Sequence, residues 1–382
     1  MPDPPDMFVS DLKSTPMDKE EVVVKEGGML HLPSYADRYT DIPRLIRLKF
    51  IAQVCPQLSV PALELAINHV KTTYNVKLYD ELYKTLCVEV SRKSLKQIDE
   101  NGESSNEAST SSGRGRMAVP YDSYWVEDNT MEATLMLQEL DAELNFKKSN
   151  SGSAYVRRIL EEIGDHYEKS GNLQMAVKFY ARVRSYCTSS ENVINMFRNL
   201  IRVSIYMENW WHVLTYIDEA KQYAFGFENL AEEVPARLSC AAGLANMGLK
   251  LYKSAAQNFL KTPYKRYDYD RIVAPEDVTF YAGLCALATF DRDSLQLRAI
   301  NSESFQPFFQ LSPKMSNILA KFCEGQLDTC AALLREIEDH VRLDVYLSPH
   351  VNTLYEMIMG RLLKKRDRKT MTEFLKKRHS SS

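Results

Sequence analysis

Apolar side chains recur at intervals of three and four residues along most of the chain, which is the period of an amphipathic helix. Stripes with this spacing start at Tyr35, recur at 61–70 and 78–90, and resume at 130–146 and beyond. No sustained alternation of period two occurs, so a sheet-based domain is not expected. The pattern therefore predicts an all-α chain.

The segment 159–187 predicts two helices joined at Ser170-Gly171-Asn172. Four of its positions follow the spacing of a tetratricopeptide repeat, in which small residues permit close helix contact and aromatic residues fill the groove: Gly164, Tyr167, Ala176 and Tyr180. Weaker copies place further turns at 209 and 248. The successive turns at 171, 209 and 248 are therefore 38 and 39 residues apart. We therefore expect a tetratricopeptide-like helical repeat solenoid, although one unit alone fits any helical hairpin equally well.

Composition divides the chain further. Residues 1–30 are acidic and contain four prolines, and 97–120 is rich in Ser, Asn, Glu and Gly. Neither segment has enough apolar area to fold, so we expect a disordered acidic tail and a disordered linker. An N-terminal helical region then occupies 31–96, and helical repeats occupy 121–277.

The last residues, 362–382, form a basic tail. Residues 361–382 carry nine Lys or Arg against two acidic residues, a net charge of +7. The tail could be a localisation signal, a patch for polyanions, or simply the solvated end of a helix. The motif YKRYDYDR at 264–271 could contact RNA, but its aspartates offset much of the charge, which favours a polar loop.

Signatures of catalysis are missing from the sequence. The 382 residues have a net charge of −3, which gives no global reason to bind nucleic acid or anionic membrane. The seven cysteines form no CxxC pair, the histidines are scattered, and no phosphate loop or nucleophile elbow occurs. Asp165-His166 fits a surface or capping role better than an acid–base pair. We therefore predict no catalytic residue, no cofactor and no metal, in a reducing compartment: cytoplasm, nucleus or both.

Nine residues are predicted to form the core between repeats, with structural rather than catalytic roles. The second group follows Ser348, a candidate helix cap, with Pro349 at the first helical position. The nine are Ile163, Gly164, Tyr167, Ala176, Tyr180, Val351, Leu354, Tyr355 and Ile358.

Several stretches resemble a known family, among them YADRYTDIPRLIRLKFIAQVCP at 35–56, GDHYEKSGNLQMAVKFYARVRSYCTS at 164–189 and LDVYLSPHVNTLYEMI at 343–358. Over about 31–361 the chain is similar to the family of subunit 1 of the COP9 signalosome, which is related to the proteasome lid's regulatory subunit seven. The resemblance implies a helical repeat arm leading into a PCI domain, whose helical half would occupy 278–361. It also implies that no winged helix follows Arg361, where the family continues into one.

The resemblance further implies a non-catalytic scaffold subunit. The complex removes Nedd8 from cullins and so regulates cullin–RING ubiquitin ligases, and its zinc isopeptidase centre lies in a different subunit. The implied partners are the other signalosome subunits and, indirectly, cullin–RING ligases, with no membrane. Two alternatives stay open: a proteasome lid subunit, and an RNA-associated PCI protein of a translation-initiation complex.

Overall fold

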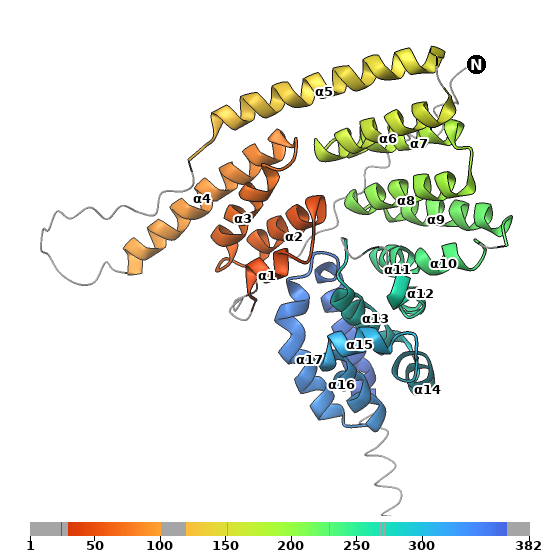
Figure 1. The fold of residues 1–382 in the computed structure, drawn as a ribbon. Helices are drawn as coiled ribbons and strands as arrows, with labels where there is room; N and C mark the ends of the chain where they lie inside the picture. The colour runs from red at the N-terminus through yellow and green to blue at the C-terminus, as the bar shows by residue number, and fades with distance from the viewer. Residues whose placement is uncertain are drawn as a thin grey trace, which may run out of the picture.

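The computed structural model describes residues 24, 30–100, 120–150, 152–228, 230–266, 269 and 272–364. Within this part of the chain the structure consists of helices, turns and loops, and it contains no β-strand (Figure 1). The predicted all-α fold is thereby confirmed for these residues. None of their helices combines the length and the apolar run that a membrane crossing requires.

The first four helices form a compact N-terminal unit: α1 (Leu32–Ala36), α2 (Asp41–Val54), α3 (Ser59–Val70) and α4 (Val76–Glu100). Leu48, Ile51 and Ile67 are completely buried in its core. Helix α2 ends just before Pro56, which has no N–H to continue the ladder. The Asn75 side chain accepts a 3.0 Å hydrogen bond from the Leu78 N–H and so closes the start of α4.

A long helix, α5 (Ser123–Asn150), runs from the N-terminal unit to the first repeat (Figure 1). The repeat consists of α6 (Ser153–Lys169) and α7 (Leu173–Arg182), followed by the short η1 (Val183–Tyr186). Gly171 adopts φ +76° at the junction, a conformation that residues with a side chain rarely adopt. Asn172 then accepts a hydrogen bond from the Met175 N–H and starts α7.

Two further hairpins continue the array. The first pairs α8 (Ser190–Tyr206) with α9 (Trp210–Phe225), and the second pairs α11 (Ser239–Gly248) with α12 (Tyr252–Phe259). The short α10 (Glu233–Arg237) lies between the two hairpins, and η2 (Tyr264–Arg266) follows the second. The three junctions fall at 170–172, 207–209 and 249–251, next to the predicted turns. The helical repeat is therefore confirmed.

The C-terminal part is built around one buried helix. This helix, α13 (Pro275–Thr289), is covered on almost every side, with twelve buried residues. The elements around it are α14 (Arg292–Leu295), η3 (Gln296–Ile300), α15 (Gln306–Leu311), α16 (Pro313–Glu324), α17 (Leu327–Arg342), η4 (Ser348–His350) and a helix over 351–364.

The structure changes several predicted boundaries. Helix α4 continues to Glu100, inside the predicted linker, while 101–119 and the tail beyond residue 364 lie outside the described residues. Val24, within the predicted disordered tail, is buried, and its N–H donates a 3.0 Å hydrogen bond to the Val54 carbonyl. At Val24 the prediction of disorder is wrong, because its apolar side chain packs in a cluster with Val54 and Leu343.

Candidate functional site

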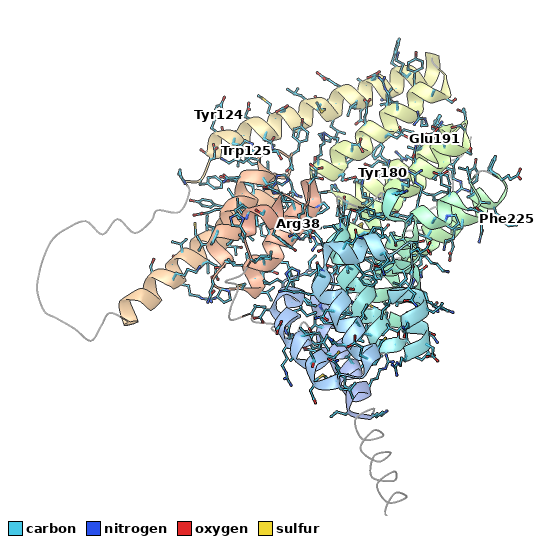
Figure 2. All side chains as sticks on the ribbon, turned by 60° about the horizontal axis from the view of Figure 1, so that its bottom comes forward. Arg38, Tyr124, Trp125, Tyr180, Glu191 and Phe225 are labelled. Atoms are coloured by element: carbon cyan, nitrogen blue, oxygen red, sulfur yellow. The ribbon has the colours of Figure 1, made fainter. Side chains whose placement is uncertain are left out.

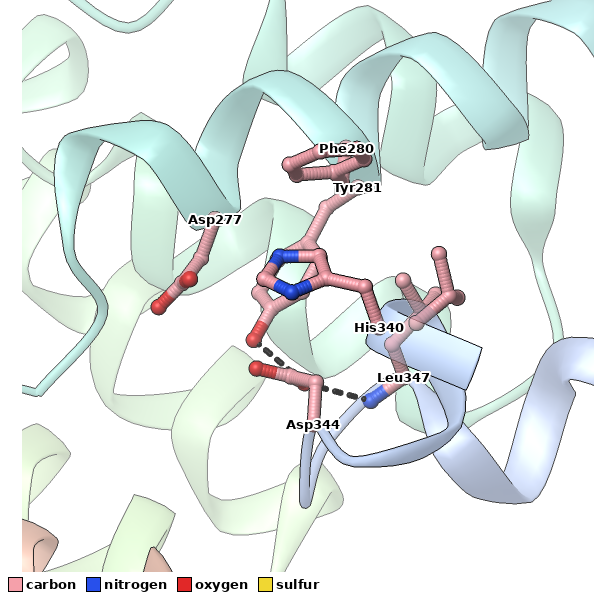
Figure 3. A pocket seen from close by; sticks show the side chains of 7 residues that line it. Asp277, Phe280, Tyr281, His340, Asp344 and Leu347 are labelled. Atoms are coloured by element: carbon pink, nitrogen blue, oxygen red, sulfur yellow. Dashed lines mark hydrogen bonds between the residues drawn. The ribbon is translucent and has the colours of Figure 1, made fainter. Parts of the chain in front are cut away.

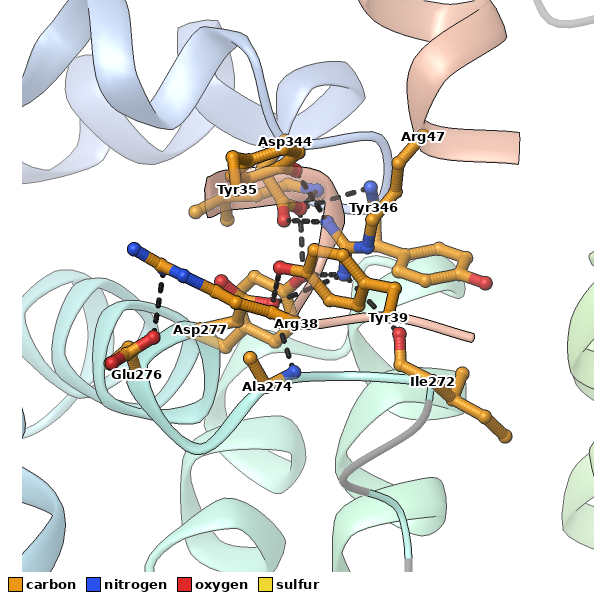
Figure 4. Close-up of polar contacts among 12 residues, drawn as sticks. Tyr35, Arg38, Tyr39, Arg47, Ile272, Ala274, Glu276, Asp277, Asp344 and Tyr346 are labelled. Carbon is orange, nitrogen blue, oxygen red and sulfur yellow. Dashed lines mark hydrogen bonds and ion pairs between the residues drawn. The ribbon is translucent and has the colours of Figure 1, made fainter. Parts of the chain in front are cut away.

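Three segments that are distant in sequence meet at the guanidinium of Arg47 (Figure 4). Arg47 comes from α2, and its side chain is 1 % exposed. Its Nη1 donates to Asp344 Oδ2 at 2.5 Å, in the turn after α17, and its Nη2 donates to Asp277 Oδ2 at 3.2 Å, in the first turn of α13. The N-terminal unit is thus joined to the C-terminal part by two buried ion pairs. We call this group, with Tyr39 and Tyr281, the Arg47 cluster.

Tyrosine hydroxyls complete the hydrogen bonds of the two carboxylates. Tyr39 donates to Asp277 Oδ2 at 2.6 Å, and Tyr281 donates to Asp344 Oδ1 at 2.7 Å. The Arg47 guanidinium also lies 4.1 Å from the centre of the Tyr39 ring, which is a cation–π distance. Burial raises the pKa of Tyr39 and of Tyr281 well above the ordinary value, so both hydroxyls keep their protons and donate.

The cluster contains one cation and two carboxyl groups in a buried place. Burial raises the pKa of Asp277 to about 6, even though the Arg47 charge opposes that shift. Burial also opposes the charge on Arg47, but the surrounding tyrosines and carboxylates hold its pKa above the ordinary value. Arg47 therefore stays charged, and removing it would leave buried acids without a counter-ion.

The carboxylate of Asp344 also shapes the backbone around it (Figure 3). Its Oδ1 accepts hydrogen bonds from the N–H groups of Tyr346 at 3.0 Å and Leu347 at 2.8 Å. A small hollow lies beside it, lined in part by Phe280 and His340, with a cavity volume of about 10 Å³. That is below the roughly 300–1,000 Å³ of small-molecule sites. Most polar atoms here bind one another, and the Arg47 Nε and the Tyr346 hydroxyl are the exceptions among the described residues around the cluster. The geometry fits a structural joint rather than a ligand site.

The sequence analysis did not single out Arg47, Asp277 or Asp344. One signal was available: Arg47 lies four residues before Ile51 and seven before Val54, so it shares the buried face of α2. A charged residue on that face requires a partner. The partners themselves are 230 and 297 residues away in sequence, and helical periodicity cannot identify them.

The first group of predicted core residues lies between α6 and α7. Ile163, Ala176 and Tyr180 are completely buried, and a Cβ added to Gly164 would lie 2.6 Å from Tyr180 Cε1. Tyr167 is half-buried, and its ring stacks 5.3 Å from that of Phe179.

The side chains of the adjacent Asp165 and His166 have different surroundings. The carboxylates of Asp165 and Glu168 share the single proton of the Tyr180 hydroxyl, at oxygen–oxygen distances of 2.5 Å and 2.9 Å. His166 is buried beside the Tyr74 ring of the N-terminal unit, with 5.3 Å between ring centres. A surface role for His166 is therefore wrong, because the N-terminal unit covers that face of α6.

The second predicted group lies on the helix over 351–364. Val351, Leu354 and Ile358 are completely buried, whereas Tyr355 is half-buried and its hydroxyl donates to the Leu334 carbonyl at 2.8 Å. Among the described residues there is no group of three or more His, Cys, Asp or Glu side chains that could hold a metal ion.

The fold defines a class: an all-α repeat protein whose array leads into the helical half of a PCI domain. The family model for "26S proteasome subunit RPN7" matches residues 122–298, which spans the repeats and α13. The chain is 39 % identical to COP9 signalosome complex subunit 1b of Drosophila melanogaster over 372 residues, covering 90 % of this chain and 71 % of the relative. It is 32 % identical to subunit 1 of the complex from Arabidopsis thaliana, covering 88 % and 71 %. The chain belongs to the COP9 signalosome subunit 1 family.

Similarity to a proteasome protein is weaker. The 26S proteasome non-ATPase regulatory subunit 6 of Dictyostelium discoideum is 22 % identical over 242 residues, covering 59 % of this chain and 60 % of the relative. The comparisons therefore favour the signalosome branch over the proteasome branch of the same architecture.

Proposed function

We propose that this chain is a non-catalytic scaffold subunit of the COP9 signalosome, the complex that removes Nedd8 from cullins and so regulates cullin–RING ubiquitin ligases. The observation that carries the proposal is the 39 % identity to the Drosophila subunit across 90 % of this chain. Its direct partners are then other signalosome subunits, and its link to cullin–RING ligases is indirect. It works in the cytoplasm and the nucleus.

The Arg47 cluster supports a scaffold role. A scaffold must hold its binding surfaces in fixed relative positions, and this cluster ties the N-terminal unit to α13 and to the turn after α17. The cluster fixes the relative positions of these elements without catalysing a reaction. The nine predicted core residues serve the same purpose within the division proposed above: 31–96, the repeats over 121–277, and the helical half of a PCI domain over 278–361.

The RNA-associated alternative draws less support from the aromatic residues of 264–271. Tyr269 is only 5 % exposed, and Tyr264, which is 38 % exposed, packs edge-on against Phe308 with 5.1 Å between ring centres. Stacking on bases requires accessible ring faces. The basic tail beyond residue 364 lies outside the described residues.

Co-expression tests the proposal. The full chain is produced with the other signalosome subunits, and the mixture is separated by size exclusion. Stoichiometric co-elution, with cleavage of neddylated cullin by the assembly and none by the chain alone, is the expected result. Chelator-sensitive cleavage by the purified chain alone would overturn the scaffold assignment. Failure to co-elute would overturn membership of the complex.

A further inference from the structure

Helix α5 carries two apolar stripes on opposite faces. The inner stripe includes Leu137, Leu140 and Leu144, which pack into the large core of the repeats. At the start of the helix, Trp125 and Val126 pack against the core of the N-terminal unit. These contacts account for the attachment of α5 to the rest of the molecule.

The outer stripe faces solvent. It consists of Tyr124, Met131, Leu135 and Phe146, which are 78 %, 60 %, 50 % and 62 % exposed. Their spacings of seven, four and eleven residues keep them on one face of a straight helix. Figure 2 shows Tyr124 on the outer side of α5 and Trp125 on the side of the N-terminal unit. Among the residues that the structure describes, these four side chains keep half or more of their surface exposed, and the Phe146 ring lies 5.9 Å from Lys147 Nζ.

Most of the helix carries only negative charge. From residue 123 to residue 146 there are six acidic residues and no Lys, Arg or His, whereas the last turn carries Lys147 and Lys148. On the helical wheel, the exposed Asp128 and Glu139 lie along one border of the outer stripe, and the exposed Glu127 lies along the other. An apolar stripe with acidic borders is complementary to an apolar stripe with basic borders.

We propose that the outer face of α5 is the docking surface for an amphipathic helix of another protein, one whose apolar stripe is bordered by Lys and Arg. From Tyr124 to Phe146 the surface is about 33 Å long at 1.5 Å per residue. A partner helix of about 22 residues would cover it. The acidic borders speed association and select against acidic helices, and this effect weakens with salt.

The chain's own basic segment, 361–382, has a charge complementary to this surface, but it begins far from α5. The helix over 351–364 that leads into it lies at the opposite end of the molecule from α5 (Figure 1). Binding of this segment from a second copy of the chain is therefore the competing outcome of the test.

The test measures binding of a labelled helical peptide to the full chain by fluorescence anisotropy. The peptide, about 25 residues long, has Leu at the spacing of the outer stripe and Lys at the borders, and a matched peptide has Glu in place of Lys. We expect the Lys peptide to bind at least about tenfold more tightly than the Glu peptide at about 50 mM salt, and the difference to shrink at about 500 mM. Equal binding of the two peptides would overturn the proposal.

Variants locate the site. Met131→Ser with Leu135→Ser should weaken binding of the Lys peptide about tenfold or more, because it removes the centre of the stripe without touching a buried residue. The control is Leu297→Ser, which changes an apolar residue of η3 that is 70 % exposed. Equal effects of the two changes would contradict the assignment. So would self-association of the chain that the double substitution abolishes, since the occupant would then be a second copy.

Photo-crosslinking inside cells identifies the natural occupant. A benzoylphenylalanine at position 131, with position 297 as the control, is crosslinked in the full chain, and the attached segment is sequenced. A segment with apolar residues at intervals of three and four and with Lys or Arg borders is expected. An acidic segment, one without helical periodicity, or no crosslink above the control would overturn the proposal.

Discussion

Replacing Arg47 with Met removes the cation of the Arg47 cluster while keeping most of the side-chain volume. Asp277 and Asp344 then remain buried without a counter-ion. Removing one partner of a buried pair costs about 3–5 kcal/mol. Protonation of the acids limits that loss, because the pKa of Asp277 is already about 6 with Arg47 present. We therefore expect a loss of about 3–5 kcal/mol at pH 7.5 and a smaller loss at pH 5.5.

The loss should appear first as separation of the N-terminal unit from the C-terminal part, since both ion pairs of Arg47 cross that boundary. Hydrogen exchange of the amides in α1, α2 and α13, followed by mass spectrometry, reports this local opening. Urea unfolding followed by circular dichroism reports the global change. We expect faster exchange in these three helices, with little change in α8 and α9.

Two further variants separate the causes. Arg44→Met is the matched control, because Arg44 lies one turn from Arg47 and pairs with the exposed Asp37. It should cost no more than about 1 kcal/mol. Combining Arg47→Met with Asp277→Asn and Asp344→Asn removes the unpaired charges and should recover much of the loss. Equal effects of Arg47→Met and Arg44→Met, or a triple variant no better than the single one, would refute the account of the joint.

Three more predictions concern other parts of the chain. Gly164→Leu should overpack the contact with Tyr180 and lower stability by about 1–3 kcal/mol, whereas Gly152→Ala, which meets open space, should be nearly neutral; an unchanged melting temperature for Gly164→Leu would contradict this. Burial lowers the pKa of His350 to about 4, so the unfolded chain binds more protons between pH 6.5 and 4, and stability falls as the pH falls through that window. Urea unfolding at several pH values should therefore show that the free energy of unfolding of His350→Gln rises relative to that of the wild type by up to about 3 kcal/mol as the pH falls to 4. Plots of the two free energies against pH that stay parallel would refute this. Limited proteolysis should cut first within 1–23 and 101–119, whose composition cannot support a core, and strong protection of both segments would count against that expectation.

Local spacing predicts much of the fold, because helices and hairpins depend on residues close in sequence. The 3.6-residue period indicates helices, and Gly164 with Tyr180 identifies a close helix contact only 16 positions apart in the chain. The Arg47 cluster depends instead on residues 230 and 297 positions apart, which one sequence does not connect. Only the burial of Arg47 among apolar neighbours could have been inferred.

Helix α5 shows a second limit of sequence reasoning. Its apolar residues fall on two opposite faces, so the helix has no single hydrophobic side and periodicity does not tell which stripe is buried. His166 shows the same limit in another form. Its helix position was evident, but the Tyr74 ring that covers it comes from the N-terminal unit, which no local pattern places there.

Purification of the tagged chain, expressed from its own locus, with identification and quantitation of the associated proteins by mass spectrometry, tests membership of the signalosome most directly. The account predicts the other signalosome subunits in near-stoichiometric amounts. Proteasome lid subunits or translation-initiation proteins in their place, with signalosome subunits at background, would contradict it.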